Sequence, residues 1–154
     1  MNLKNYTSSV PVETTIARIE SYLIGTGLVS GIGKKYSNGQ TSSIVFEIKY
    51  KEDRLPLAVR LEAKIPQCLD FFWRDYCATA RRPRKTKEDF AEQAARTAWR
   101  LQEDDVRVQT SLILLKQKTV VEAFMASVMV DGEQTFYQQV EGRGFKQLAA
   151  PKAE

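Results

Sequence analysis

The hydrophobic residues of this chain change their spacing twice, and this change limits the folds that the chain can adopt. Residues 11–25 repeat apolar side chains at helical spacing, and Gly25 and Gly27 suit the end of a helix. Residues 41–51, TSSIVFEIKYK, alternate apolar and polar side chains, which is the period of a half-buried strand. From Lys64 onward the helical spacing returns. The sequence therefore predicts strands that are preceded and followed by helices.

Two further segments extend the alternating strand into a sheet. Residues 28–36 form the strand before it, because Asn38-Gly39 can adopt the positive φ angles of a hairpin turn. Residues 55–62, LPLAVRLE, alternate in the same way after it. Three consecutive strands with short loops predict an antiparallel meander that is apolar on one side and charged on the other.

Four helices are predicted after the meander: one from Lys64, a long one over 87–117, a short one after Thr119 and a last one over 135–142. The predicted fold is a two-layer α+β domain of order α-β-β-β-α-α-α-α, with the helices packed on one face of the sheet. The length suits a single domain, residues 1–154, with a C-terminal tail that frays from about residue 149.

The long helix carries an apolar seam whose residues are four and three positions apart in turn: Ala94, Ala98, Leu101, Asp105, Val108, Leu112 and Leu115. This spacing predicts packing against another helix. Asp105 does not fit the seam. Two explanations are open: Asp105 pairs with an arginine of a neighbouring helix, or the seam is interrupted there.

Residue types exclude several chemistries. The chain has no histidine and two cysteines, which rules out imidazole metal sites, Ser-His-Asp triads and Cys-His pairs. Cys68 and Cys77 lie about 13 Å apart along one predicted helix and cannot form a disulfide there. No cofactor or resident metal is predicted. Because no apolar run could cross a bilayer and the first residues lack a secretory signal, a cytoplasmic protein without membrane contact is expected.

The most concentrated charge lies between two predicted helices, where five basic residues occupy seven positions: Arg81, Arg82, Arg84, Lys85 and Lys87. Without them the chain has 18 basic and 19 acidic residues, so the net charge of +4 is local in origin. Guanidinium and ammonium groups beside a helix N-terminus favour phosphate binding. A passive, solvated elbow between helices is the alternative. Basic residues on the open face of the meander could extend the surface: Lys49, Lys51, Arg54 and Arg60.

The triplet Glu62-Ala63-Lys64 follows the third predicted strand. Metal-dependent nucleases of the restriction-endonuclease type use an acid, a spacer and a lysine in this position, together with another carboxylate that helps to hold Mg²⁺. Asp53 is the candidate for that second carboxylate. The alternative is a solvated strand end followed by the start of a helix.

Three stretches resemble an uncharacterised family of small proteins of phages, prophages and other mobile elements, including cassette-type elements: KNYTSSVPVETTIARIESYL, RRPRKTKEDFAEQAARTAWRLQEDDVRVQ and GFKQL. The most specific part of the resemblance is AARTAWR, residues 94–100. The family usually has an aromatic residue after the acidic pair, where this chain has Asp105, so the helix seam differs. The resemblance implies a setting in mobile DNA and transfers no catalytic residue.

These observations give three hypotheses. The first is a non-enzymatic accessory protein of a mobile element that contacts nucleic-acid phosphates through residues 81–87. The second is a protein-interaction module, either a homodimer formed through the helix seam or an inhibitor of a host factor. The third is a Mg²⁺-dependent nuclease that uses Asp53, Glu62 and Lys64.

Overall fold

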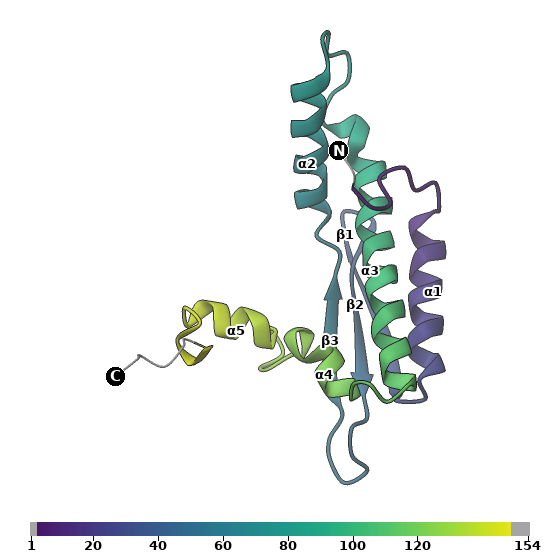
Figure 1. Cartoon of the computed structure of the whole chain (residues 1–154), viewed down its shortest axis with the longest axis vertical. Helices are drawn as coiled ribbons and strands as arrows, with labels where there is room; N and C mark the ends of the chain where they lie inside the picture. The colour runs from purple at the N-terminus through teal and green to yellow at the C-terminus, as the bar shows by residue number, and fades with distance from the viewer. Residues whose placement is uncertain (1–2, 149–154) are drawn as a thin grey trace.

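The computed structural model describes residues 3–148 and has the predicted α+β order (Figure 1). Its main elements are α1 (Val12–Gly25), β1 (Val29–Ser37), β2 (Gln40–Ile48), β3 (Leu57–Glu62), α2 (Ile65–Thr79), α3 (Ala91–Leu114), α4 (Val120–Phe124) and α5 (Phe136–Gly142). Three short 3-10 turns accompany them: η1 (Glu88–Phe90), η2 (Met125–Ser127) and η3 (Lys146–Leu148). The tail predicted to fray from about residue 149 lies outside the described residues.

The three strands form the predicted antiparallel meander, in the order β1-β2-β3. Asn38 and Gly39 make the hairpin turn with φ angles of 51° and 75°, which confirms the turn expected from their sequence. Phe46 lies opposite Ile32 on β1 and Val59 on β3. Successive side chains point to opposite faces, so these apolar residues share one face of the sheet.

Helices α1 and α3 cover this apolar face (Figure 1). The core contains residues from all of these elements: Ile16, Ile19 and Leu23 from α1, Ile44, Phe46 and Ile48 from β2, Val59 and Leu61 from β3, and Trp99 and Val106 from α3. Trp99 is fully buried, and its indole N–H donates a hydrogen bond of 3.1 Å to the carbonyl oxygen of Thr41. Trp99 therefore joins the long helix to the start of β2.

The seam predicted along α3 is only half correct. Ala94 and Ala98 are buried, and α2 packs against the first half of α3. In the second half, Val108 is 56% exposed and Leu115 is 70% exposed, while Val106 and Thr110 are buried instead. The sheet and α1 lie on the side of α3 that carries Trp99 and Val106, so the end of the predicted seam points outward. Asp105 is exposed for the same reason.

Glu103 is the buried acidic residue of α3. Its side chain is 3% exposed. The Arg100 guanidinium pairs with it from the same helix, and the Arg18 guanidinium on α1 lies 3.9 Å from its other carboxylate oxygen. A buried carboxylate needs such partners, because burial removes its hydration. This ion-pair group therefore connects α1 to α3.

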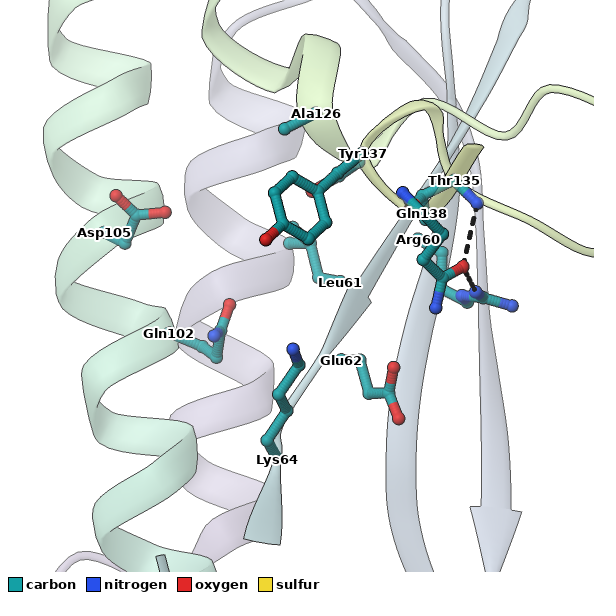
Figure 2. Close-up of a pocket in the computed structure, with 11 residues that line it drawn as sticks. Arg60, Leu61, Glu62, Lys64, Gln102, Asp105, Ala126, Thr135, Tyr137 and Gln138 are labelled. Atoms are coloured by element: carbon teal, nitrogen blue, oxygen red, sulfur yellow. Dashed lines mark hydrogen bonds between the residues drawn. The ribbon is translucent and has the colours of Figure 1, made fainter. Parts of the chain in front are cut away.

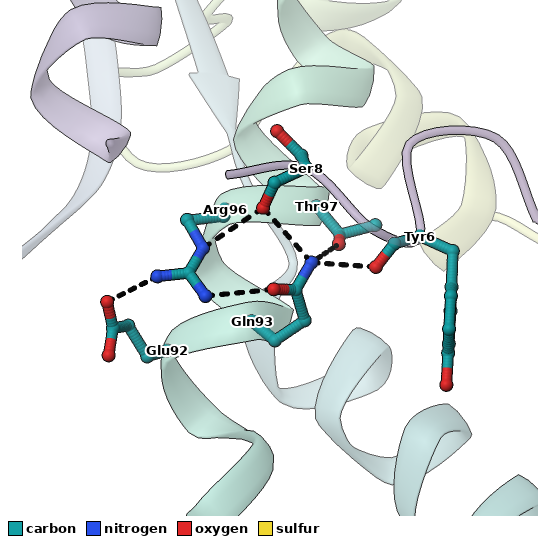
Figure 3. A network of polar contacts seen from close by, with 6 residues as sticks. All are labelled: Tyr6, Ser8, Glu92, Gln93, Arg96 and Thr97. Atoms are coloured by element: carbon teal, nitrogen blue, oxygen red, sulfur yellow. Dashed lines mark hydrogen bonds and ion pairs between the residues drawn. The ribbon is translucent and has the colours of Figure 1, made fainter. Parts of the chain in front are cut away.

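The segment before α1 is tied to α3 by a polar network (Figure 3). The amide of Gln93 donates to the backbone oxygens of Tyr6 and Ser8, at 2.7 and 3.3 Å. Arg96 donates to the Ser8 oxygen at 3.1 Å and also pairs with Glu92. The N-terminal segment therefore has a fixed path across the first turns of α3.

No helix within residues 3–148 is both long enough and apolar enough to cross a membrane.

Candidate nucleic-acid interface

The basic residues form a loop that connects α2 to η1 and stands at one end of the elongated molecule (Figure 1). We call residues 80–87 the elbow. Arg81, Arg82, Arg84 and Lys85 are exposed, and Lys87 is half-buried. The long helix begins later than predicted, because η1 comes first and regular α-helix starts at Ala91.

The elbow is held in place by the residues beneath it. The hydroxyl oxygen of Tyr76 accepts hydrogen bonds from the backbone N–H groups of Arg84 and Lys85, at 2.8 and 3.1 Å. The Thr86 N–H donates to the Asp89 carboxylate at 2.7 Å, which is one half of a capping box. The Tyr76 ring also packs against Phe90, with ring centroids 5.2 Å apart. The elbow therefore has an ordered backbone.

The five basic residues do not contribute equally. Lys87 pairs with Asp70, and this hydrogen-bonded ammonium holds the pKa of the Asp70 carboxyl below its usual value. Lys85 lies over the Phe90 ring, 5.5 Å from its centroid. Within residues 3–148, Arg81, Arg82 and Arg84 make no ion pair. These three guanidinium groups are therefore the ones available to an external anion.

We expect Tyr76→Phe to loosen the elbow without unfolding the protein. The change removes only the acceptor of two exposed hydrogen bonds, each worth about 0.5 kcal/mol, so local opening should increase about fivefold. The measurement is the rate of trypsin cleavage after residues 81–87, with cleavage after Lys51 in the β2–β3 loop as the internal control. An unchanged rate in the elbow would show that Tyr76 does not order it.

The other basic residues do not extend the elbow surface, so this expectation was wrong. Lys49, Lys51 and Arg54 lie at the end of β2 and in the loop to β3, at the opposite end of the molecule (Figure 1). Arg60 is already engaged, because its guanidinium donates to the Glu133 backbone oxygen at 3.0 Å and to the Gln138 amide oxygen at 2.9 Å. Arg60 therefore connects β3 to the segment before α5.

The expected nuclease set is not assembled around Asp53. Asp53 precedes β3 and Glu62 ends it, so the strand separates them by about 17 Å. Glu62 and Lys64 instead line a cleft of about 260 Å³ with Asp105 of α3 and Tyr137 of α5 (Figure 2). Within residues 3–148 no three Asp, Glu or Cys side chains are grouped so that they could hold a metal ion.

Burial raises the pKa of the Cys68 thiol.

Two features of this region were missed from the sequence. The backbone of the elbow is held by the Tyr76 hydroxyl, and no pattern in the sequence indicated this contact. The α5 helix has a complete capping box, in which Thr135 and Gln138 bond to each other's backbone N–H groups. The Thr-x-x-Gln pattern that opens TFYQQV, residues 135–138, is the sequence signal for the start of that helix.

Comparison of the chain with protein-family models, with curated proteins and with solved structures finds no match.

Proposed function

We propose that this protein is a non-enzymatic accessory protein of a mobile element that contacts nucleic-acid phosphates through the elbow. The observation that supports the proposal most strongly is the set of three exposed guanidinium groups, Arg81, Arg82 and Arg84, on an ordered backbone. Guanidinium groups match phosphate oxygens in geometry and charge, and a fixed backbone lowers the entropy lost on binding. The mobile-element setting rests on the sequence resemblance alone.

Phosphate contact fits the elbow better than base recognition does. The aromatic rings near the elbow, those of Trp73, Tyr76 and Phe90, pack against one another at centroid distances of 5.2 to 6.5 Å. Rings packed in this way support the loop and are poorly placed to stack on splayed bases. We therefore expect weak dependence on nucleotide sequence and strong dependence on salt.

The proposal is tested by fluorescence-anisotropy titration of labelled single- and double-stranded DNA and RNA. If three phosphates are contacted on duplex DNA, binding should weaken about fortyfold between about 50 and about 200 mM salt. Arg81→Ala, Arg82→Ala and Arg84→Ala together should remove most of the affinity and reduce the salt slope by about three. Lys85→Ala alone should have a smaller effect, because Lys85 lies over Phe90.

The chain offers a matched control for this experiment. Lys49→Ala, Lys51→Ala and Arg54→Ala together also remove three positive charges, but from the opposite end of the molecule (Figure 1). The control variant should keep nearly all of its affinity. Equal losses in the two triple variants would show attraction by net charge only, and no binding by the unmodified protein would reject the proposal.

A further inference from the structure

The C-terminal part of the described chain forms a projecting arm, residues 130–148, which contains α5 and η3 (Figure 1). Its base is fixed to β3. The Met129 N–H donates to the Ala58 oxygen at 2.8 Å, and Arg60 binds the Glu133 oxygen and Gln138. Beyond this base, α5 points away from the sheet and from α3 (Figure 1). The base therefore directs the arm outward, away from the core of its own chain.

The arm exposes large apolar side chains. Phe136 and Phe145 are each 40% exposed and Leu148 is 72% exposed. Phe145 packs on Tyr137 with ring centroids 6.1 Å apart, so these two residues of the arm form an aromatic pair. An exposed apolar surface of this kind is typical of an interaction site.

The outward face of α3 has the complementary character. Val108, Leu112 and Leu115 line a shallow groove of about 260 Å³ that is bordered by Arg107. The first half of this same seam is already covered, since Ala94 and Ala98 are buried and α2 packs against α3. The groove is therefore the uncovered half of a helix-packing surface, with space for aromatic side chains.

The charges of the arm and of the groove are also complementary. The arm also carries Arg143 and Lys146 near its end, but residues 130–142 before them contain the acidic residues Asp131, Glu133 and Glu141 and no lysine or arginine. Residues 106–118 around the groove contain the basic residues Arg107, Lys116 and Lys118 and no acidic residue. Within the described chain, none of the three acidic residues of the arm and none of the three basic residues around the groove takes part in an ion pair. The acidic part of the arm, residues 130–142, and the basic surroundings of the groove therefore carry opposite charges, although they lie apart in one chain.

We propose that the arm of one copy packs on the α3 groove of a second copy, and that the exchange is reciprocal. A two-fold axis makes both contacts at once, which doubles the buried area and covers the apolar residues of both surfaces. Each contact is small, so the dimer should have a dissociation constant in the micromolar range, on the order of 10 µM. The proposal adds a partner, a second copy of this chain, and does not depend on the elbow.

The first test is the mass of the protein in solution, measured by sedimentation equilibrium from about 1 to about 300 µM without nucleic acid. The mass should rise from one chain to two. Leu112→Glu should weaken dimerisation at least tenfold, on the order of the effect of placing a charge in an apolar contact. Leu55→Glu is the matched control, because Leu55 is 86% exposed in the β2–β3 loop, outside the arm and the groove, and should leave the dimer unchanged.

A charge-reversal experiment distinguishes exchange between copies from folding of the arm onto its own chain. Arg107→Glu and Glu141→Lys should each weaken the dimer, because each places like charges together in both contacts. An equimolar mixture of the two variants should regain the dimer, since both contacts then bring opposite charges together. A monomer at every concentration, or a dimer that none of these substitutions weakens, overturns the proposal. Neither result bears on nucleic-acid binding by the elbow.

Discussion

Trp99→Ala is expected to lower the free energy of unfolding by about 3–5 kcal/mol, on the order of the whole stability of a marginal domain. Trp99 is fully buried between α3 and the sheet, so the substitution leaves a large cavity. It also leaves the Thr41 oxygen without the indole N–H that now donates to it. Urea denaturation followed by circular dichroism measures the loss without depending on tryptophan fluorescence.

The other tryptophan provides the control for this measurement. Trp73 lies on α2 near the elbow and is only half-buried. Trp73→Ala should therefore cost about 1–2 kcal/mol, because less apolar surface loses its contacts. Similar losses at the two positions would mean that the α3–sheet contact is not the main core of the molecule.

Glu103→Ala is expected to cost about 2–3 kcal/mol. The Glu103 side chain is 3% exposed, and its removal leaves the Arg100 guanidinium, now 24% exposed, without its carboxylate partner. The penalty for an unpaired charge near the protein interior exceeds the loss of the carboxylate's own contacts. The change should be measured by urea denaturation of the single variant beside the unmodified protein.

The same helix contains a matched ion pair at its surface. Glu92 pairs with Arg96, but its side chain is 82% exposed. Glu92→Ala should change the free energy of unfolding by less than about 0.5 kcal/mol, since water hydrates both groups when they separate. If the two substitutions had equal effects, burial would not be the property that makes Glu103 important.

Alternation and turn chemistry were enough to predict the sheet. Ile44, Phe46 and Ile48 could be assigned to one face because strand side chains alternate strictly, and this assignment is confirmed. Asn38-Gly39 identified the hairpin because few other residue pairs adopt its φ angles at low cost. In both cases the deciding information lies within a few adjacent residues.

The long helix shows where such reasoning fails. Its sequence carries two apolar stripes on different sides, one through Trp99 and Val106 and one through Val108 and Leu112. Periodicity detects both stripes but does not show which one meets the sheet. That choice depends on α1 and on contacts between residues far apart in sequence, such as Trp99 with Thr41. The same limit explains why Asp105 was placed on a packed seam although it is exposed.

The basic elbow could be found from the composition of the sequence, but the contacts that hold its backbone in place could not. Five basic residues among seven positions are visible in the sequence. The support from Tyr76 depends on a hydroxyl that reaches Arg84 and Lys85 across the end of α2. The ion pair between Lys87 and Asp70 likewise joins residues 17 positions apart, which no local pattern relates.

Helix α2 buries Phe72 alone among its residues in the described structure, whereas α1 and β2 each bury four or more. Its amide hydrogens should consequently exchange with solvent through a local opening, well before those of α1 and β2, which should exchange only on global unfolding. The segment that ends in the basic elbow is thus joined to a more stable body, and it can open and close again while the rest of the protein stays folded.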